Sequence, residues 1–158
     1  MKILTIGTTR QIQEGDYENT EKFKRVLAYL SIHFGVQIIM EEWTSLKGDT
    51  VAKRLAAERK IDWRNIVTPS TAEMKTAARL VDIWQGSMIF ISRYGPVDAQ
   101  TRRECSMLEE IRTAMNGKEI GLLILGWAHL HSLSERLVRA GFEVEPFYWS
   151  KPETTLEF

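Results

Sequence analysis

The sequence contains one cysteine and no long run of apolar residues. The single cysteine, Cys105, excludes an internal disulfide and favours a reducing compartment. No stretch approaches the ~18 consecutive apolar residues that a membrane-spanning helix needs, and the apolar run in MKILTIGTTR is too short for a secretory signal. We therefore expect a cytoplasmic protein with no membrane partner.

The sequence also lacks net charge, because Lys plus Arg and Asp plus Glu both number 21 among its 158 residues. This balance argues against a broad electrostatic surface for nucleic acid, and the five tryptophans are not accompanied by clustered basic residues. We do not expect nucleic-acid binding. The composition, 44% hydrophobic and 27% charged, is that of a soluble globular protein. The length favours a single domain over residues 1–158.

Short apolar runs alternate along the chain with segments of helical periodicity. The runs predict strands at 2–7, 36–43, 61–67, 120–126 and 142–149, the last as an edge strand because Pro146 limits its pairing. Helices are predicted at 20–35, 48–60, 69–84, 96–117 and 129–141, whereas 10–19 is predicted as a loop and 87–92 fits either a helix or a strand. Asp49 is the candidate N-cap of the helix at 48–60. The alternation predicts an α/β fold with three layers, α/β/α, around a mostly parallel sheet of about five strands.

Polar residues follow three of the predicted strands. The segment GTTR at 7–10 follows the first, Glu41 and Glu42 end the second, and GWAHLH at 126–131 follows the most apolar one. In a parallel sheet, ligand sites gather beyond the carboxyl ends of the strands. We therefore expect these three segments to share one site.

The two histidines of the third segment lie two residues apart, so on a helix they point in different directions. We expect His129, which is nearer to Gly126, to face the site as a general base or metal ligand. His131 is a further candidate for ligand binding. The alternative for His129 is a neutral ring packed at the start of a helix, where the helix dipole disfavours the charged form.

Glu41 and Glu42 are neighbours on a strand and point to opposite faces, so only one can face a shared cleft unless the strand has already ended. There it could bind a metal or act as general base; the alternative is that both are solvated. Arg103 lies one turn before Met107 and borders the apolar face of its helix. Its guanidinium could clamp a carboxylate or phosphate, and the alternative is an ordinary surface ion pair.

The segment after the first strand matches no phosphate-loop pattern. Even so, Gly7, Thr8 and Thr9 could meet an anion through backbone N–H groups. We therefore expect these three residues to contribute to ligand binding together with Arg10.

The motifs keep one order along nearly the whole chain: GTTRQIQ at 7–13, EE at 41–42, RE at 103–104 and GWAH at 126–129. In this order they resemble those of small bacterial α/β proteins with a Gly-Glu-Glu-His type start, a Glu-Glu pair after the second strand, an Arg-Glu helix and a Gly-x-x-His turn. Those proteins are similar in turn to minimal, divergent members of the Tiki/TraB and erythromycin-esterase group. In that group, acids and histidines at strand ends form a hydrolytic or metal-dependent site.

The resemblance implies catalytic roles for Glu41 or Glu42, for Glu104 and for His129. It implies ligand-binding roles for Arg103 and Gly126.

One departure from the family changes the expected chemistry. Where the first motif should offer an acid and a histidine, this sequence has Thr8, Thr9 and Arg10. Threonine is a poor metal ligand and arginine is none, so a divalent metal site is expected to be weakened. The sequence does not determine which cofactor, if any, the protein binds. The chain is then a metal-free relative, a pseudoenzyme, or a protein that binds a small anionic molecule through Arg10 and Arg103.

Three functions follow from the sequence. The first is a small-molecule-binding protein with a hydrolase-like site at the carboxyl ends of the strands. The second is a non-catalytic interaction protein that acts as a homo-oligomer. The third is a structural role through homodimerisation, indicated by the tryptophans and the strand at 142–149. The polar strand ends favour a ligand site over the third function.

Overall fold

The computed structural model describes residues 1–15, 19–43, 49–67 and 99–148. The predicted helix at 69–84 and the ambiguous segment at 87–92 lie outside these residues. Within the described part, five parallel strands form one sheet in the order β3-β2-β4-β1-β5. The strands are β1 (Lys2–Thr8), β2 (Ile38–Glu41), β3 (Asp62–Asn65), β4 (Ile120–Gly126) and β5 (Glu143–Phe147).

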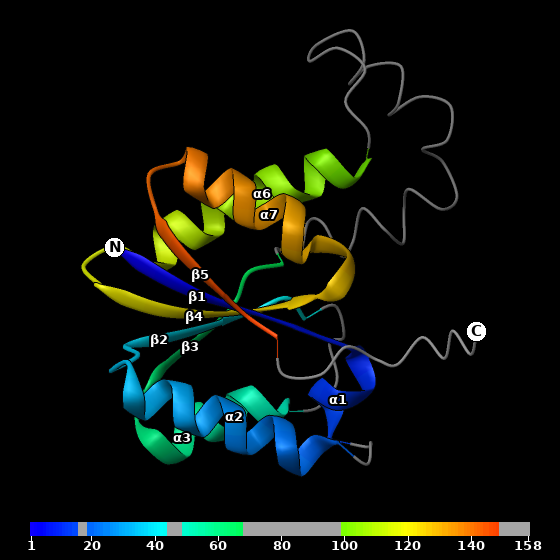
Figure 1. Cartoon of the computed structure of the whole chain (residues 1–158), viewed down its shortest axis with the longest axis vertical. Coiled ribbons are helices and arrows are strands. Elements are labelled where there is room, and N and C mark those ends of the chain that lie inside the picture. The colour runs from blue at the N-terminus through cyan, green and yellow to red at the C-terminus, as the bar shows by residue number, and fades with distance from the viewer. Residues whose placement is uncertain (16–18, 44–48, 68–98, 149–158) are drawn as a thin grey trace, which may run out of the picture.

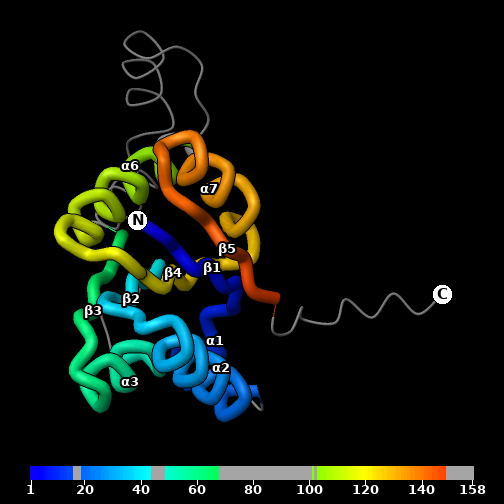
Figure 2. The backbone as a smooth tube through the Cα atoms, turned by 60° about the vertical axis from the view of Figure 1, so that its left-hand side comes forward, coloured from blue at the N-terminus to red at the C-terminus, as the bar shows by residue number. Residues whose placement is uncertain are grey.

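Helices cover both faces of the sheet, which confirms the predicted three-layer α/β/α architecture (Figures 1 and 2). The helices on one face are α1 (Arg10–Glu14), α2 (Thr20–His33) and α3 (Val51–Arg59). The helices on the other face are α6 (Ala99–Ala114) and α7 (Trp127–Arg139). Figure 2 shows β5 along one edge of the sheet, beside β1, and this edge position agrees with the prediction from Pro146.

The apolar runs divide between two cores because successive residues of a strand point to opposite faces. In β4, Leu122 and Ile124 belong to the core beneath α1, α2 and α3, whereas Leu123 and Leu125 belong to the core beneath α6 and α7. The central strands are therefore apolar at nearly every position, as expected for strands buried on both faces. The same alternation decides the face on which each residue at a strand end lies.

Two local predictions are wrong. The segment predicted as a loop at 10–19 begins with the short helix α1, because Ile12 and Gln13 are buried against the sheet and Gly15 ends the helix with a left-handed φ of 92°. Helix α3 is capped by Thr50 rather than Asp49, and the Thr50 Oγ1 accepts a hydrogen bond from the Lys53 N–H at 3.0 Å. Asp49 instead pairs with Lys53 at the surface.

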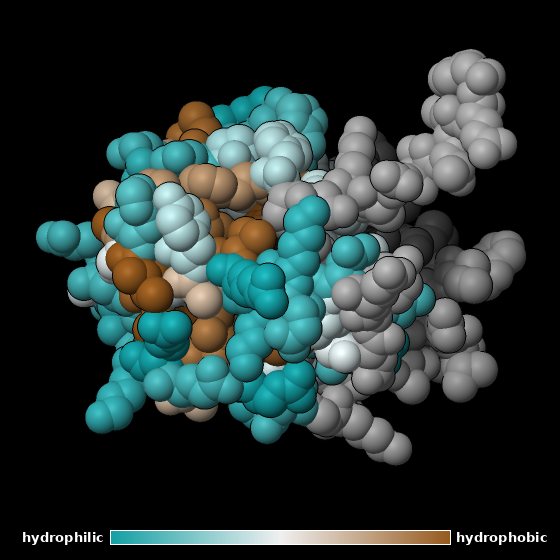
Figure 3. All heavy atoms as spheres, turned by 60° about the horizontal axis from the view of Figure 1, so that its bottom comes forward, coloured by the Kyte–Doolittle hydropathy of each residue, from teal (hydrophilic) through white to brown (hydrophobic). Residues whose placement is uncertain are grey.

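The surface over α2 carries apolar groups. Tyr29 and Ile32 of this helix are 59% and 63% exposed, and Figure 3, which brings this side of the molecule forward, shows hydrophobic side chains among mainly hydrophilic ones. None of the described helices combines the length and the apolar character needed to cross a membrane.

Gly7 determines how closely α7 approaches β1. A Cβ atom at this position would lie 2.4 Å from Cε3 of Trp127, the first residue of α7. No real Cβ contact is that short, so the indole lies where a side chain at position 7 would otherwise stand. The missing side chain thereby helps to place the helix that carries His129.

We expect the substitution Gly7→Ala to lower the free energy of unfolding by about 1–3 kcal/mol, because the added methyl group overpacks the contact with Trp127. Urea unfolding of Gly7→Ala, Trp127→Leu and the double variant measures this coupling. The cost of Gly7→Ala should largely disappear when the indole is absent. An equal cost in both backgrounds would refute the explanation.

Candidate functional site

The end of β2 places two buried carboxyl groups on opposite sides of the sheet. Glu41 is 0% and Glu42 is 8% exposed. Glu41 contacts side chains from α1, β3 and the start of α3, whereas Glu42 contacts α6 and the start of α7. The alternation expected of a strand therefore continues through Glu42, and only this acid reaches the remaining candidate residues.

Glu42 lies among donors from two distant parts of the chain. One carboxylate oxygen, Oε1, forms an ion pair with Nη2 of Arg103, and the other, Oε2, accepts a hydrogen bond from the Gly126 N–H at 3.0 Å. Nε2 of His129 lies 3.7 Å from Oε1. The carboxylate is thus held by a guanidinium and a backbone donor, with an imidazole beside it.

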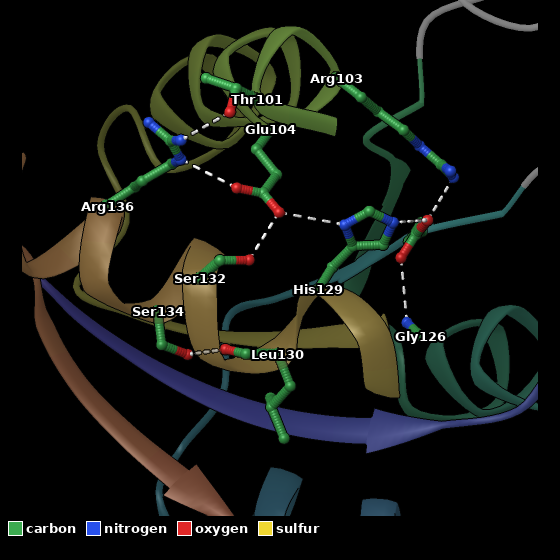
Figure 4. Close-up of polar contacts among 10 residues, drawn as sticks. Thr101, Arg103, Glu104, Gly126, His129, Leu130, Ser132, Ser134 and Arg136 are labelled. Carbon is green, nitrogen blue, oxygen red and sulfur yellow. Dashed lines mark hydrogen bonds and ion pairs between the residues drawn. The ribbon is translucent and has the colours of Figure 1, made fainter. Parts of the chain in front are cut away.

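His129 lies between two carboxylates. Its Nδ1 is 3.2 Å from Oε1 of Glu104, a residue only 1% exposed, and its Nε2 faces Glu42. Figure 4 shows the ring with Glu104 on one side and Arg103 and Gly126 on the other. An ionised Glu104 can only accept hydrogen bonds, so Nδ1 carries the proton and Nε2 presents a lone pair when the ring is neutral.

Two further side chains of α7 hold Glu104. Ser132 donates a hydrogen bond to Oε1 at 2.6 Å, and Nε of Arg136 bonds Oε2 at 2.9 Å. His129, Ser132 and Arg136 are three and four residues apart, so they share the face of α7 that meets α6. This spacing is visible in the sequence, but the sequence alone does not connect it with Glu104. We define Glu42, Arg103, Glu104 and His129 as the His129 cluster.

Glu41 lies in a different environment on the opposite face. Its carboxyl group accepts hydrogen bonds from Gln13 Nε2 at 3.1 Å, Thr50 Oγ1 at 2.5 Å and Trp63 Nε1 at 3.0 Å. All three donors are uncharged, and burial raises the pKa of Glu41 to about 7 while the hydrogen bonds partly oppose that rise. Gln13 ends the GTTRQIQ segment, whereas Thr50 and Trp63 belong to no motif, and nothing in the sequence connects any of the three with Glu41.

The remaining candidates lie outside the His129 cluster. His131 is 90% exposed and lies near Glu135, so it points away from the buried ring of His129. Arg10 pairs with Glu14 at 2.8 Å and lies 5.9 Å from the ring centre of Trp43. These positions separate His131 and Arg10 from the cluster.

The threonines after β1 also lie apart from the cluster. Thr8 alternates with Leu4 and Ile6, so it faces the α1 side of the sheet. It is 1% exposed, and its Oγ1 has no hydrogen-bond partner within the described part of the chain. Thr9 precedes α1, and its carbonyl accepts the N–H of Gln13.

The ion pairs change the expected chemistry of the two arginines. Arg103 is paired with Glu42 and Arg10 with Glu14, so an anionic ligand would compete with a carboxylate for either guanidinium.

A metal site fits the residues no better. No group of three His, Cys, Asp or Glu side chains able to hold a metal occurs among the described residues, and the guanidinium at Glu42 would repel a cation.

Comparison of the chain with protein-family models and with curated proteins finds no match.

We expect Glu41 to make the folded state less stable as the pH rises. At a pH below 4.5, the ordinary pKa of a glutamate, the group is protonated in both states, and between 4.5 and about 7 the unfolded chain loses the proton first. Folded stability should then fall by up to about 3 kcal/mol over this range. The variant Glu41→Gln lacks this titration.

Urea unfolding of the wild type and Glu41→Gln at about pH 4 and about pH 8 measures the effect, since other titrating groups cancel in the difference. The stability of Glu41→Gln relative to the wild type should increase at the higher pH. A difference that does not change with pH would contradict the raised pKa of Glu41.

Proposed function

We propose that the His129 cluster is an acid–base site that hydrolyses an ester bond of a small molecule. One observation carries this proposal: an imidazole held between two buried carboxylates, Glu104 and Glu42, beyond the carboxyl ends of parallel strands. Ligand sites of parallel sheets gather at this edge, and a histidine oriented by a buried acid is the usual arrangement for general base catalysis.

Each member of the cluster has a distinct role in this proposal. Glu104 orients the ring through Nδ1, and Nε2 of His129 removes a proton from the attacking water. Glu42, 3.7 Å from Nε2, stabilises the imidazolium that forms. The water oxygen adds to the carbonyl carbon, the ester C–O bond breaks, and the imidazolium returns the proton to the leaving oxygen. Arg103 holds the Glu42 carboxylate in place through their ion pair.

The charge balance favours an uncharged ester over a phosphate. The carboxylates of Glu42 and Glu104 face the guanidinium groups of Arg103 and Arg136, so the cluster offers no uncompensated positive charge among its described members. A phosphate would have to displace a carboxylate from its partner, at the cost of a buried ion pair. The resemblance to the Tiki/TraB and erythromycin-esterase group supports the hydrolytic proposal independently of this argument.

The alternative proposal is a binding protein without catalysis. It is favoured by Thr8, Thr9 and Arg10, which replace the acid and histidine of the resembled family. Such a protein would hold a small anionic molecule at Arg103 or act as a homo-oligomer, and Tyr29 and Ile32 supply exposed apolar surface on α2 for the second case.

A matched pair of histidine variants tests the hydrolytic proposal. We expect the wild type to hydrolyse members of a panel of p-nitrophenyl esters, and His129→Ala to lower the rate by about 10²–10⁴-fold. His131→Ala changes the same residue type two positions away, on the exposed side of α7, and should keep the wild-type rate. Equal losses in both variants, or hydrolysis unaffected by His129→Ala, would exclude the assigned general base.

The wild type and Arg103→Ala distinguish binding from catalysis. If Arg103 holds an anion without catalysis, inorganic phosphate should raise the melting temperature of the wild type and not that of Arg103→Ala, while no ester is hydrolysed. Ester hydrolysis with no phosphate-dependent rise in melting temperature would instead support the acid–base site.

A further inference from the structure

The side-chain amide of Gln13 bridges the two acids at the end of β2. Its Nε2 donates to Oε1 of Glu41 at 3.1 Å and to the backbone carbonyl oxygen of Glu42 at 3.2 Å. The residue is 4% exposed. An amide nitrogen has two hydrogens in one plane, so it can serve both acceptors at the same time.

We propose that Gln13 is a positioning residue for the His129 cluster, acting through the backbone of Glu42 from the opposite face of the sheet. The effect of Gln13 on catalysis rests on the function proposed above for the cluster. Gln13 itself touches the Glu42 backbone and Glu41, on the face of β2 that α1 covers.

The backbone around Glu42 shows why a positioning residue is needed. The Glu42 N–H bonds the Ile124 carbonyl at 2.9 Å, which continues the pairing of β2 with β4. On the following residue, both backbone groups of Trp43 bond the Asn65 side chain, at 3.2 and 2.8 Å. The Glu42 carbonyl between these attachments receives its donor from Gln13. Gln13 therefore supplies the hydrogen bond that holds the Glu42 carbonyl. It thereby helps to fix the backbone from which the Glu42 side chain projects towards His129.

A second contact attaches α1 to the same strand end. Arg10, three residues before Gln13 on this helix, lies 5.9 Å from the ring centre of Trp43. The short helix thus contacts three consecutive residues at positions 41–43, which explains why a polar segment after β1 is ordered against the sheet. Removing the amide of Gln13 would leave a buried carbonyl and a buried carboxyl group each without one donor.

Nuclear magnetic resonance of the ring nitrogens tests the proposal, because the chain has three histidines and two of them, His33 and His131, are exposed and serve as internal references. The test variant is Gln13→Met, which keeps the side-chain length and removes both donors. Glu42→Gln defines the effect of neutralising the carboxylate beside His129. Thr50→Val is the matched control, because it removes a donor to Glu41 and the cap of α3 without touching Glu42.

We expect Gln13→Met to shift the Nε2 resonance of His129 in the direction that Glu42→Gln defines, while the His33 and His131 signals keep their positions. Thr50→Val should lower the melting temperature and leave the His129 signals as in the wild type. A general loss of stability would affect both variants alike, so a shift confined to Gln13→Met identifies positioning.

His129 signals that coincide in Gln13→Met, Thr50→Val and the wild type would overturn the proposal. If circular dichroism shows that Gln13→Met does not fold, Gln13→Asn replaces it, because its amide is one methylene shorter and cannot reach both acceptors. The measurement uses the protein without substrate. A shift of the His129 resonance in Gln13→Met, together with no ester hydrolysis by the wild type, would therefore support the positioning role and reject only the proposed function.

Discussion

The structure depends on the burial of two adjacent carboxyl groups at the end of one strand. Glu41 and Glu42 have to face opposite sides of the sheet, and each loses nearly all of its contact with water. A buried acid is tolerated only with hydrogen-bond donors or opposite charge. Helices α1, α3, α6 and α7 therefore meet this point with donors, and the arrangement of polar groups at the sheet edge follows from that requirement.

The two faces meet the requirement by different chemistry. On the α6 and α7 side, Glu42 and Glu104 face guanidinium groups and an imidazole, so charge is balanced within a buried group of side chains. On the α1 and α3 side, Glu41 meets only uncharged donors, and its pKa rises to about 7. The two neighbouring glutamates thus have different consequences. Glu42 belongs to the proposed acid–base site, whereas Glu41 makes the folded state less stable as the pH rises.

Sequence patterns predicted most of the framework, because apolar runs and helical periodicity report burial directly. They also separated His129 from His131, since two residues on a helix diverge in direction. They failed at α1, where burial of Ile12 and Gln13 overcomes a polar local composition. They also failed for Gln13, Thr50, Ser132 and Arg136, because nothing in the type or spacing of these residues indicates which acid each of them contacts.

The α/β alternation, the parallel sheet and the divergence of Glu41 and Glu42 can be predicted from residue order, since each depends on local patterns. Helix packing in the folded chain is what places Glu42, rather than Glu41, in a cluster with Arg103, Glu104 and His129. That choice depends on which helices pack on which face of β2. The packing is a long-range outcome of strand order and helix placement, and no short segment of sequence encodes it.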